Sequence, residues 1–160
     1  MTSQFMFAFL SLLVPGIASA GDCAVARVVM ANPDVKLEHP TDGPITPGYG
    51  LLKRPLLQTL RPHNGIDYSG AVGTPIRAAS AGVVIEAAFK GEFGNSVRLD
   101  HGARQTVYAH LSRILVKPGD CVLLGDFIGS LGNTGLSTGP HLHFEIHPAG
   151  DPQPLLPPRN

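Results

Sequence analysis

The sequence predicts an all-β protein built from antiparallel sheets. Short apolar runs alternate with glycine-containing turns over residues 82–147, and none of them has the length and the 3.6-residue period of an amphipathic helix. The composition agrees, because 19 Gly, 15 Pro and no Trp among 160 residues are typical of a chain with many turns. Strands are expected at residues 82–89, 96–99, 106–111, 121–128 and 141–147.

The remaining segments are expected to be irregular. Residues 21–43 form an N-terminal extension without periodicity, residues 51–62 a loop, and the Pro-rich end of the chain a closing tail. The length suits a single domain, which we place at residues 44–156, with residues 157–160 after it.

The charge balance excludes one class of partner. The formal net charge is +0, from 12 basic and 12 acidic residues, and no basic stripe is present. This argues against a nucleic-acid-binding protein and against tight electrostatic docking on an anionic surface.

The first 20 residues predict a signal peptide. An apolar run over residues 5–14 ends at Pro15, and Ala18-Ser19-Ala20 follows as a small-x-small cleavage site before Gly21. The run is too short to span a bilayer, so no stable membrane insertion is expected after cleavage. No Lys or Arg precedes the run, which leaves an uncleaved, membrane-anchored segment as the alternative. Either way the domain would be exported, to the periplasm or the medium.

Export would place Cys23 and Cys121 in an oxidising compartment. Two cysteines can form a disulfide there, which would tie the N-terminal extension to the domain. Two separate thiols are the alternative.

Two residues near the start of the domain have metal-ligand chemistry. His63 and Asp67 stand four apart, with Gly65 between them. Imidazole nitrogen and carboxylate oxygen are both zinc ligands, and Gly65 permits a close backbone approach. Taken alone the pair is weak, because such spacings are common by chance.

A second cluster lies in the strand expected at residues 141–147. Its alternation predicts that Leu142, Phe144 and Ile146 face the core. The opposite face would carry His141, His143 and Glu145. Two imidazoles on one face of a strand can reach the same ion. The alternative to a metal site is a polar strand edge that faces solvent and has no chemical role.

A further histidine, His110, ends the strand expected at residues 106–111, on the face of Thr106 and Tyr108. Considered without the other motifs, His110 would be interpreted as a residue with a structural role only. A catalytic zinc site needs three protein ligands and one open position, and His63, Asp67 and one of His141 or His143 would supply the three. The remaining histidines are then available for proton transfer. No Ser/His/Asp arrangement or activated cysteine competes with this interpretation.

The order and spacing of these motifs resemble the lysostaphin-type (LytM-like) zinc metallopeptidases, which are peptidoglycan endopeptidases. H-x-x-x-D at residues 63–67 is followed far downstream by H-x-H at residues 141–143. The similarity covers roughly residues 44–156, and includes residues 73–76, 81–84, 94–97, 100–102 and 107–112.

The resemblance implies an antiparallel β domain of the duplicated-hybrid-motif type, with a groove over the sheet. It implies one Zn²⁺ per chain, held by His63, Asp67 and His143, and a zinc-bound water as nucleophile. His110 and His141 would be the two catalytic histidines. The substrates would be the peptide stems or bridges of peptidoglycan. Glu145 is the rival general base, and the resemblance favours the histidines.

The chain departs from the family pattern before the first motif. Members often carry G-x-R-x-H-P, whereas Leu52 replaces the Arg here and Arg54 replaces the His. In the family these positions shape the groove, so the differences bear on substrate specificity and not on zinc binding. His39, His101 and His147 are expected to be structural or solvated.

Two rival functions remain. One is a catalytically inactive regulator or binding module of cell-wall hydrolases. The other is a carrier domain, because residues 116–120 and 125–129 resemble biotinyl and lipoyl hairpins, although the Lys-bearing tip is missing. Metal content separates the zinc peptidase from both.

Overall fold

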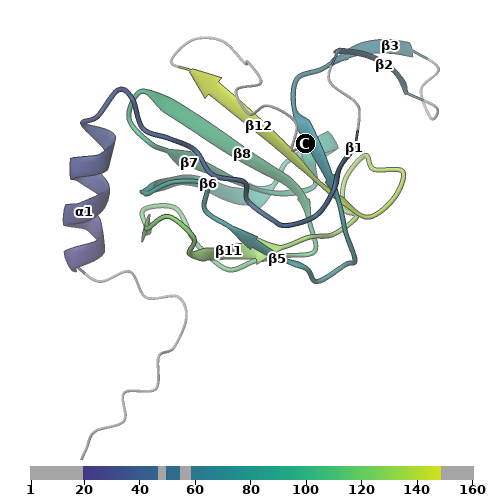
Figure 1. Cartoon of the computed structure of the whole chain (residues 1–160). Helices are drawn as coiled ribbons and strands as arrows, with labels where there is room; N and C mark the ends of the chain where they lie inside the picture. The colour runs from purple at the N-terminus through teal and green to yellow at the C-terminus, as the bar shows by residue number, and fades with distance from the viewer. Residues whose placement is uncertain (1–19, 47–49, 55–58, 149–160) are drawn as a thin grey trace, which may run out of the picture.

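The computed structural model describes residues 20–46, 50–54 and 59–148. In this part of the chain antiparallel strands dominate, which confirms the predicted all-β class (Figure 1). In chain order the elements are α1 (Ala20–Met30), β1 (Ile45–Thr46), β2 (Gly50–Arg54), β3 (Thr59–His63), β4 (Ile66–Ser69), β5 (Pro75–Arg77), β6 (Gly82–Phe89), the 3₁₀ turn η1 (Gly91–Phe93), β7 (Asn95–Asp100), β8 (Arg104–Leu111), β9 (Arg113–Ile114), β10 (Cys121–Val122), β11 (Phe127–Ser130) and β12 (His141–Pro148).

The strands form three sheets. The largest has seven strands in the order β1-β4-β12-β8-β7-β6-β10, a second has three in the order β5-β11-β9, and β2 pairs with β3. Figure 1 shows β5 and β11 stacked against the large sheet, with the β2–β3 hairpin at the end away from α1. Strand β12 pairs on one side with β4 and on the other with β8.

The hydrophobic core lies between the large sheet and the three-stranded sheet. Ile76 of β5 and Ile128 of β11 contribute from one side, and Leu142, Phe144 and Ile146 of β12 from the other. These β12 side chains are at most 1% exposed, as the alternation predicts. The opposite face of β12 is therefore left for its polar side chains.

Most expected strands occur close to their predicted positions. The strand predicted at residues 82–89 is β6, and β7, β8 and β12 extend the other predictions by one or two residues. The run at residues 121–128 is divided between β10 and β11, which join different sheets. The break is a turn in which the backbone N–H of Leu123 donates to Asp126 Oδ2 at 2.7 Å.

The loop expected at residues 51–62 is wrong in part, because β2 and β3 form a hairpin there with Gly50 opposite His63. The segment lacks period-2 alternation and contains Pro62, which obscured it. A two-stranded ribbon tolerates a proline, because one side of each strand has no partner.

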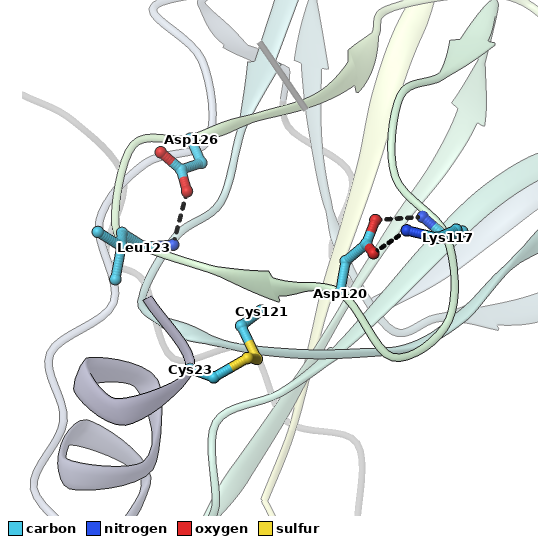
Figure 2. The surroundings of a disulfide bond; sticks show 6 residues. All are labelled: Cys23, Lys117, Asp120, Cys121, Leu123 and Asp126. Carbon is cyan, nitrogen blue, oxygen red and sulfur yellow. Dashed lines mark hydrogen bonds and ion pairs between the residues drawn. A yellow bond between two sulfur atoms is a disulfide. The ribbon is translucent and has the colours of Figure 1, made fainter. Parts of the chain in front are cut away.

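The extension predicted without periodicity at residues 21–43 contains α1, so that prediction is also wrong. The helix packs on β6 and β10 with Ala26 fully buried. Cys23 of α1 is joined to Cys121 of β10 by a disulfide (Figure 2). Isolated helices of this length are marginal in water. Packing and the cross-link therefore stabilise α1, and its local sequence pattern does not reveal it.

The chain after α1 also follows the domain closely. Backbone hydrogen bonds join Glu38 N–H to Ala79 O at 2.8 Å and Arg77 N–H to Pro40 O at 2.9 Å. This segment leads into β1, which pairs with β4. The N-terminal extension thus forms a strap from α1 to the edge of the large sheet.

No helix within the described ranges is long and apolar enough to cross a membrane. The apolar run at residues 5–14 and the tail after residue 148 lie outside the described residues. Their predicted roles, and the domain boundary at residue 156, stay predictions.

Candidate active site

Three side chains converge on one point on the polar face of the large sheet. His63 is the last residue of β3, Asp67 lies within β4, and His143 lies opposite Asp67 in the β4–β12 register. His63 Nε2 is 3.1 Å from Asp67 Oδ1 and 3.0 Å from His143 Nδ1, and His143 Nδ1 is 2.8 Å from Asp67 Oδ1. Their potential ligand atoms form the cluster of the described residues that could hold a metal ion.

Gly65, in the turn between β3 and β4, makes this convergence possible. A Cβ at position 65 would lie 2.5 Å from His143 Cε1 and 2.8 Å from the carbonyl oxygen of Phe144. A side chain larger than hydrogen would therefore displace His143 or part the strands.

The donor set fits a bound cation. Two imidazole nitrogens 3.0 Å apart both face one carboxylate oxygen, and hydrogen bonds alone cannot satisfy all three pairs at once. Burial alone would raise the pKa of Asp67, but the hydrogen bonds from His143 and His63 hold it well below its ordinary value. Burial alone would lower the pKa of His143, but Asp67 and Glu145 raise it to about 9. Positive charge is thus favoured here, and nitrogen and oxygen donors of this kind suit Zn²⁺.

A row of polar side chains on β12 supports His143. Its Nε2–H donates to Glu145 Oε1 at 3.0 Å, which leaves Nδ1 for the cluster. His147 Nε2 in turn lies 2.7 Å from Glu145 Oε2. His147, which was expected to be structural or solvated, has a structural place in this row. The continued alternation 143, 145, 147 was the signal that could have found it.

His141 lies beside the cluster without joining the triangle. Its Nδ1–H donates to Gly139 O at 2.8 Å, and Ser137 Oγ lies 3.1 Å from the same nitrogen. Its Nε2 is 3.9 Å from Asp67 Oδ1. The H-x-H pair is therefore divided by geometry, with His143 in the cluster and His141 next to it.

His110 of β8 lies beside the same cluster. It therefore lies on the opposite face of the sheet from the one that alternation predicts. One residue of β7 faces two of β8, because the register passes from Asn95 opposite Leu111 to Val97 opposite Tyr108. His110 lies in this bulge at φ 62°, the single non-glycine residue with positive φ in the described ranges. Tyr108 packs in the core, 5.1 Å between ring centroids from Phe144.

The bulge turns His110 to the opposite side of the sheet from Tyr108. Its ring centroid is 4.6 Å from that of His141 and 5.9 Å from that of His143. Its Nδ1–H donates to Thr134 O at 2.9 Å. Burial, then the neighbouring His141, lowers the pKa of His110 to about 4.

Two other histidines lie away from the cluster, as expected. His101 is 1% exposed, with Nδ1 2.8 Å from Ala81 O and Nε2 2.8 Å from Thr106 Oγ1. His39 Nδ1 lies 2.7 Å from the hydroxyl of Tyr68. An aromatic ring that the sequence did not single out, Phe93 of η1, lies 6.0 Å from the His143 ring. Leu52 and Arg54, the departures from the family pattern, lie in β2.

Comparison with known proteins identifies the family. Residues 61–155 match the family described as Peptidase family M23, and the chain belongs to it. This confirms the resemblance to lysostaphin-type, LytM-like peptidases.

Among curated relatives, an uncharacterised metalloprotease of Haemophilus influenzae is 48% identical over 59% of this chain and 20% of its own length. A DD-carboxypeptidase/endopeptidase of Neisseria meningitidis is 44% identical over 68% of this chain and 25% of its own. The chain thus spans a quarter or less of these relatives.

Solved structures of similar fold support the same family assignment. A zinc-containing peptidase from Vibrio cholerae superimposes with a TM-score of 0.68 at 35% identity, over 74% of this chain and 38% of that one. The catalytic domain of lysostaphin from Staphylococcus simulans gives 0.58 at 39% identity, over 65% of this chain and 80% of that one.

Proposed function

We propose that this protein is an exported zinc endopeptidase that hydrolyses peptide cross-links of bacterial peptidoglycan. The observation that carries the proposal is the convergence of His63, Asp67 and His143 within 3.1 Å of one another, beside two further histidines. Three protein ligands and an open side are the requirements of a catalytic zinc site. The family and the names of the relatives supply the substrate class.

His63 Nε2, Asp67 Oδ1 and His143 Nδ1 would hold the metal. Zinc chemistry at such a site would lower the pKa of a bound water to near neutrality and polarise a peptide carbonyl. Glu145 keeps the proton of His143 on Nε2, so that Nδ1 stays available as a ligand.

His110 and His141 are assigned to proton transfer. Each has its Nδ1–H engaged by a backbone carbonyl, so each presents Nε2 as the free ring nitrogen. The low pKa of His110 keeps it neutral near pH 7, and Nε2 can then accept a proton from the attacking water. Once protonated, the same nitrogen can donate to the leaving amine or to the negative charge that develops on the carbonyl oxygen. Glu145 is enclosed by His143 and His147, which makes it a poor candidate for the base.

The bond that is cut is proposed to be the D,D cross-link between peptide stems. A relative from Vibrio cholerae named peptidoglycan DD-endopeptidase ShyA is 44% identical, and one from Staphylococcus capitis named a glycyl-glycine endopeptidase is 41% identical. Cleavage of glycine bridges is therefore the alternative for the same site.

The test is incubation of purified sacculi with the zinc-loaded protein, followed by mass analysis of the released muropeptides. Monomeric stems released from D,D-cross-linked sacculi support the proposal, whereas release only from glycine-bridged walls selects the alternative. If neither wall is cut by protein with one zinc per chain, the inactive regulator is the better interpretation.

Matched variants test the roles. His63→Ala is expected to lose its zinc, whereas His110→Ala and His141→Ala keep it and lose about 10²–10⁴-fold in rate. Loss of metal from His141→Ala but not from His143→Ala would reverse the roles within H-x-H.

A further inference from the structure

His110 occupies a backbone conformation that its neighbours must enforce. A positive φ of 62° is unfavourable for any residue with a Cβ, and it persists only where surrounding contacts over-determine it. The bulge that contains His110 decides whether its ring faces the core or the side-chain cluster of His63, Asp67 and His143. The residues that hold the bulge therefore control the site.

Thr134 makes several of the contacts around this bulge. Its carbonyl oxygen accepts the Nδ1–H of His110 at 2.9 Å, and its hydroxyl donates to Leu111 O at 2.8 Å. The hydroxyl also accepts the backbone N–H of Asn95 at 3.0 Å. One residue thus holds both the ring of His110 and the carbonyl of the next residue, Leu111.

Asn95 supports the same peptide from β7. Its side-chain Nδ2 donates to Leu111 O at 3.1 Å, the oxygen that Thr134 also contacts. Asn95 pairs with Leu111 where the register of β7 and β8 shifts. Two side chains from distant parts of the chain therefore meet on the carbonyl oxygen of Leu111, the residue after His110.

The loop that carries Thr134 is locked against the turn before β7. A Cβ at Gly94 would lie 2.4 Å from the carbonyl carbon of Thr134, and one at Gly135 would lie 2.3 Å from Gly94 N. Leu136 N–H donates to Glu92 O at 2.8 Å. The two backbones touch directly, so Thr134 has little freedom to move and can serve as a rigid support.

We propose that Thr134 and Asn95 are positioning residues that hold His110, and the orientation of its ring, in the geometry needed for proton transfer. This inference rests on the proposed function of the site. In the contacts above, neither residue touches the side chains of the proposed metal ligands. Both therefore act through His110. The carbonyl of Thr134 also fixes which ring nitrogen of His110 carries the proton.

Thr134→Val tests this, because it preserves the shape of the side chain and removes both hydroxyl hydrogen bonds. We expect the kcat for sacculus hydrolysis to fall about 10- to 100-fold while KM changes less than about twofold, because a displaced catalytic group affects the chemical step. Zinc content should be unchanged, and Thr134→Ser should recover most of the rate. Asn95→Ala should act in the same direction with a smaller effect.

A double-mutant cycle with His110→Ala separates positioning from a general structural role. If Thr134 acts through His110, Thr134→Val has no further effect once His110 is absent. Equal fold losses in both backgrounds would overturn the proposal. Thr74→Val is the matched control, since the Thr74 hydroxyl donates to Ala71 O at 2.8 Å in a turn without contact to His110. It should leave kcat unchanged.

A second readout does not depend on activity. In ¹⁵N spectra of the zinc-loaded protein, the signals lost in His110→Ala identify the ring, and the wild type should show a single tautomer with the proton on Nδ1. Thr134→Val keeps the backbone carbonyl that accepts Nδ1–H, so the tautomer should persist while the ring signals of His110 shift or broaden. Unchanged ring signals together with an unchanged kcat would refute the role of Thr134. If the wild type cuts no peptidoglycan, the proposed function fails, while the ring signals still decide whether Thr134 holds His110.

Discussion

Removal of the disulfide between Cys23 and Cys121 should cost a large part of the stability of the fold. The bond joins residues 98 apart in sequence. In the chain-entropy account a closed loop of about 100 residues stabilises by about 4.7 kcal/mol, and measured values are more often about 2–4 kcal/mol. Cys121 is 7% exposed and small, so the change to Ala adds little cavity cost. We expect Cys23→Ala/Cys121→Ala to lose about 3–4 kcal/mol.

Urea unfolding of the oxidised wild type and the double variant measures this difference. At about 2–4 °C per kcal/mol, the melting temperature should fall by about 6–16 °C. Val28→Ala on α1 is the control, because Val28 is 75% exposed and its loss should stay within about 0.5 kcal/mol. Mass spectrometry of the exported wild type should show two hydrogens fewer than the reduced chain.

A double variant within about 1 kcal/mol of the wild type would refute this contribution of the disulfide, since about 2–4 kcal/mol is typical of such a cross-link. Free reaction of both thiols of the native exported protein with an alkylating reagent would refute it as well. The first result would show that the strap docks without covalent help. The second would show that the pair stays reduced.

The other predictions concern the site and the core. Gly65→Ala should lose most of its zinc by elemental analysis, because the added Cβ would lie 2.5 Å from His143 Cε1; full occupancy would contradict the close packing. Glu145→Gln should keep most of its rate at saturating zinc but bind the metal about 10- to 100-fold more weakly in a chelator competition, and a dead variant would make Glu145 the base. Burial lowers the pKa of His101 below 6.5, so unfolding takes up a proton and the free energy of unfolding falls as pH drops below that value. His101→Asn should show a shallower fall from about pH 7.5 to about pH 5 in urea titrations, and an equal slope would refute this.

The fold class and much of β12 could be predicted because period-2 alternation operates there without interruption. Leu142 and Phe144 are buried and His143 faces the other way, as the pattern requires. The same rule gave the wrong face for His110, because a bulge in β8 adds a residue that alternation cannot count. Bulges depend on partners such as Thr134, which lies 24 residues downstream.

The helix α1 escaped prediction for a different reason. Its less exposed side chains include Cys23, Ala26 and Val29, but Val25 and Val28 on the exposed face are apolar too. No contrast between an apolar and a polar face therefore identifies the helix. Its docking depends on a cysteine at position 121 and on the turn at Gly102, where an added Cβ would lie 2.0 Å from Met30 O. These are contacts between distant segments, and a local pattern does not contain them.

The pairing of Asp67 with His143 links metal acquisition to the completion of folding. The two residues are 76 apart in sequence but opposite one another in adjacent strands, with Nδ1 to Oδ1 at 2.8 Å. A slip of one residue in this pairing would send one of them to the far side of the sheet. A chain that is still folding therefore lacks the site until β12, the last of the described strands, has docked. A metal bound by this cluster would then be taken up only where the sheet closes, and it would stabilise the correctly registered chain over chains with a slipped register.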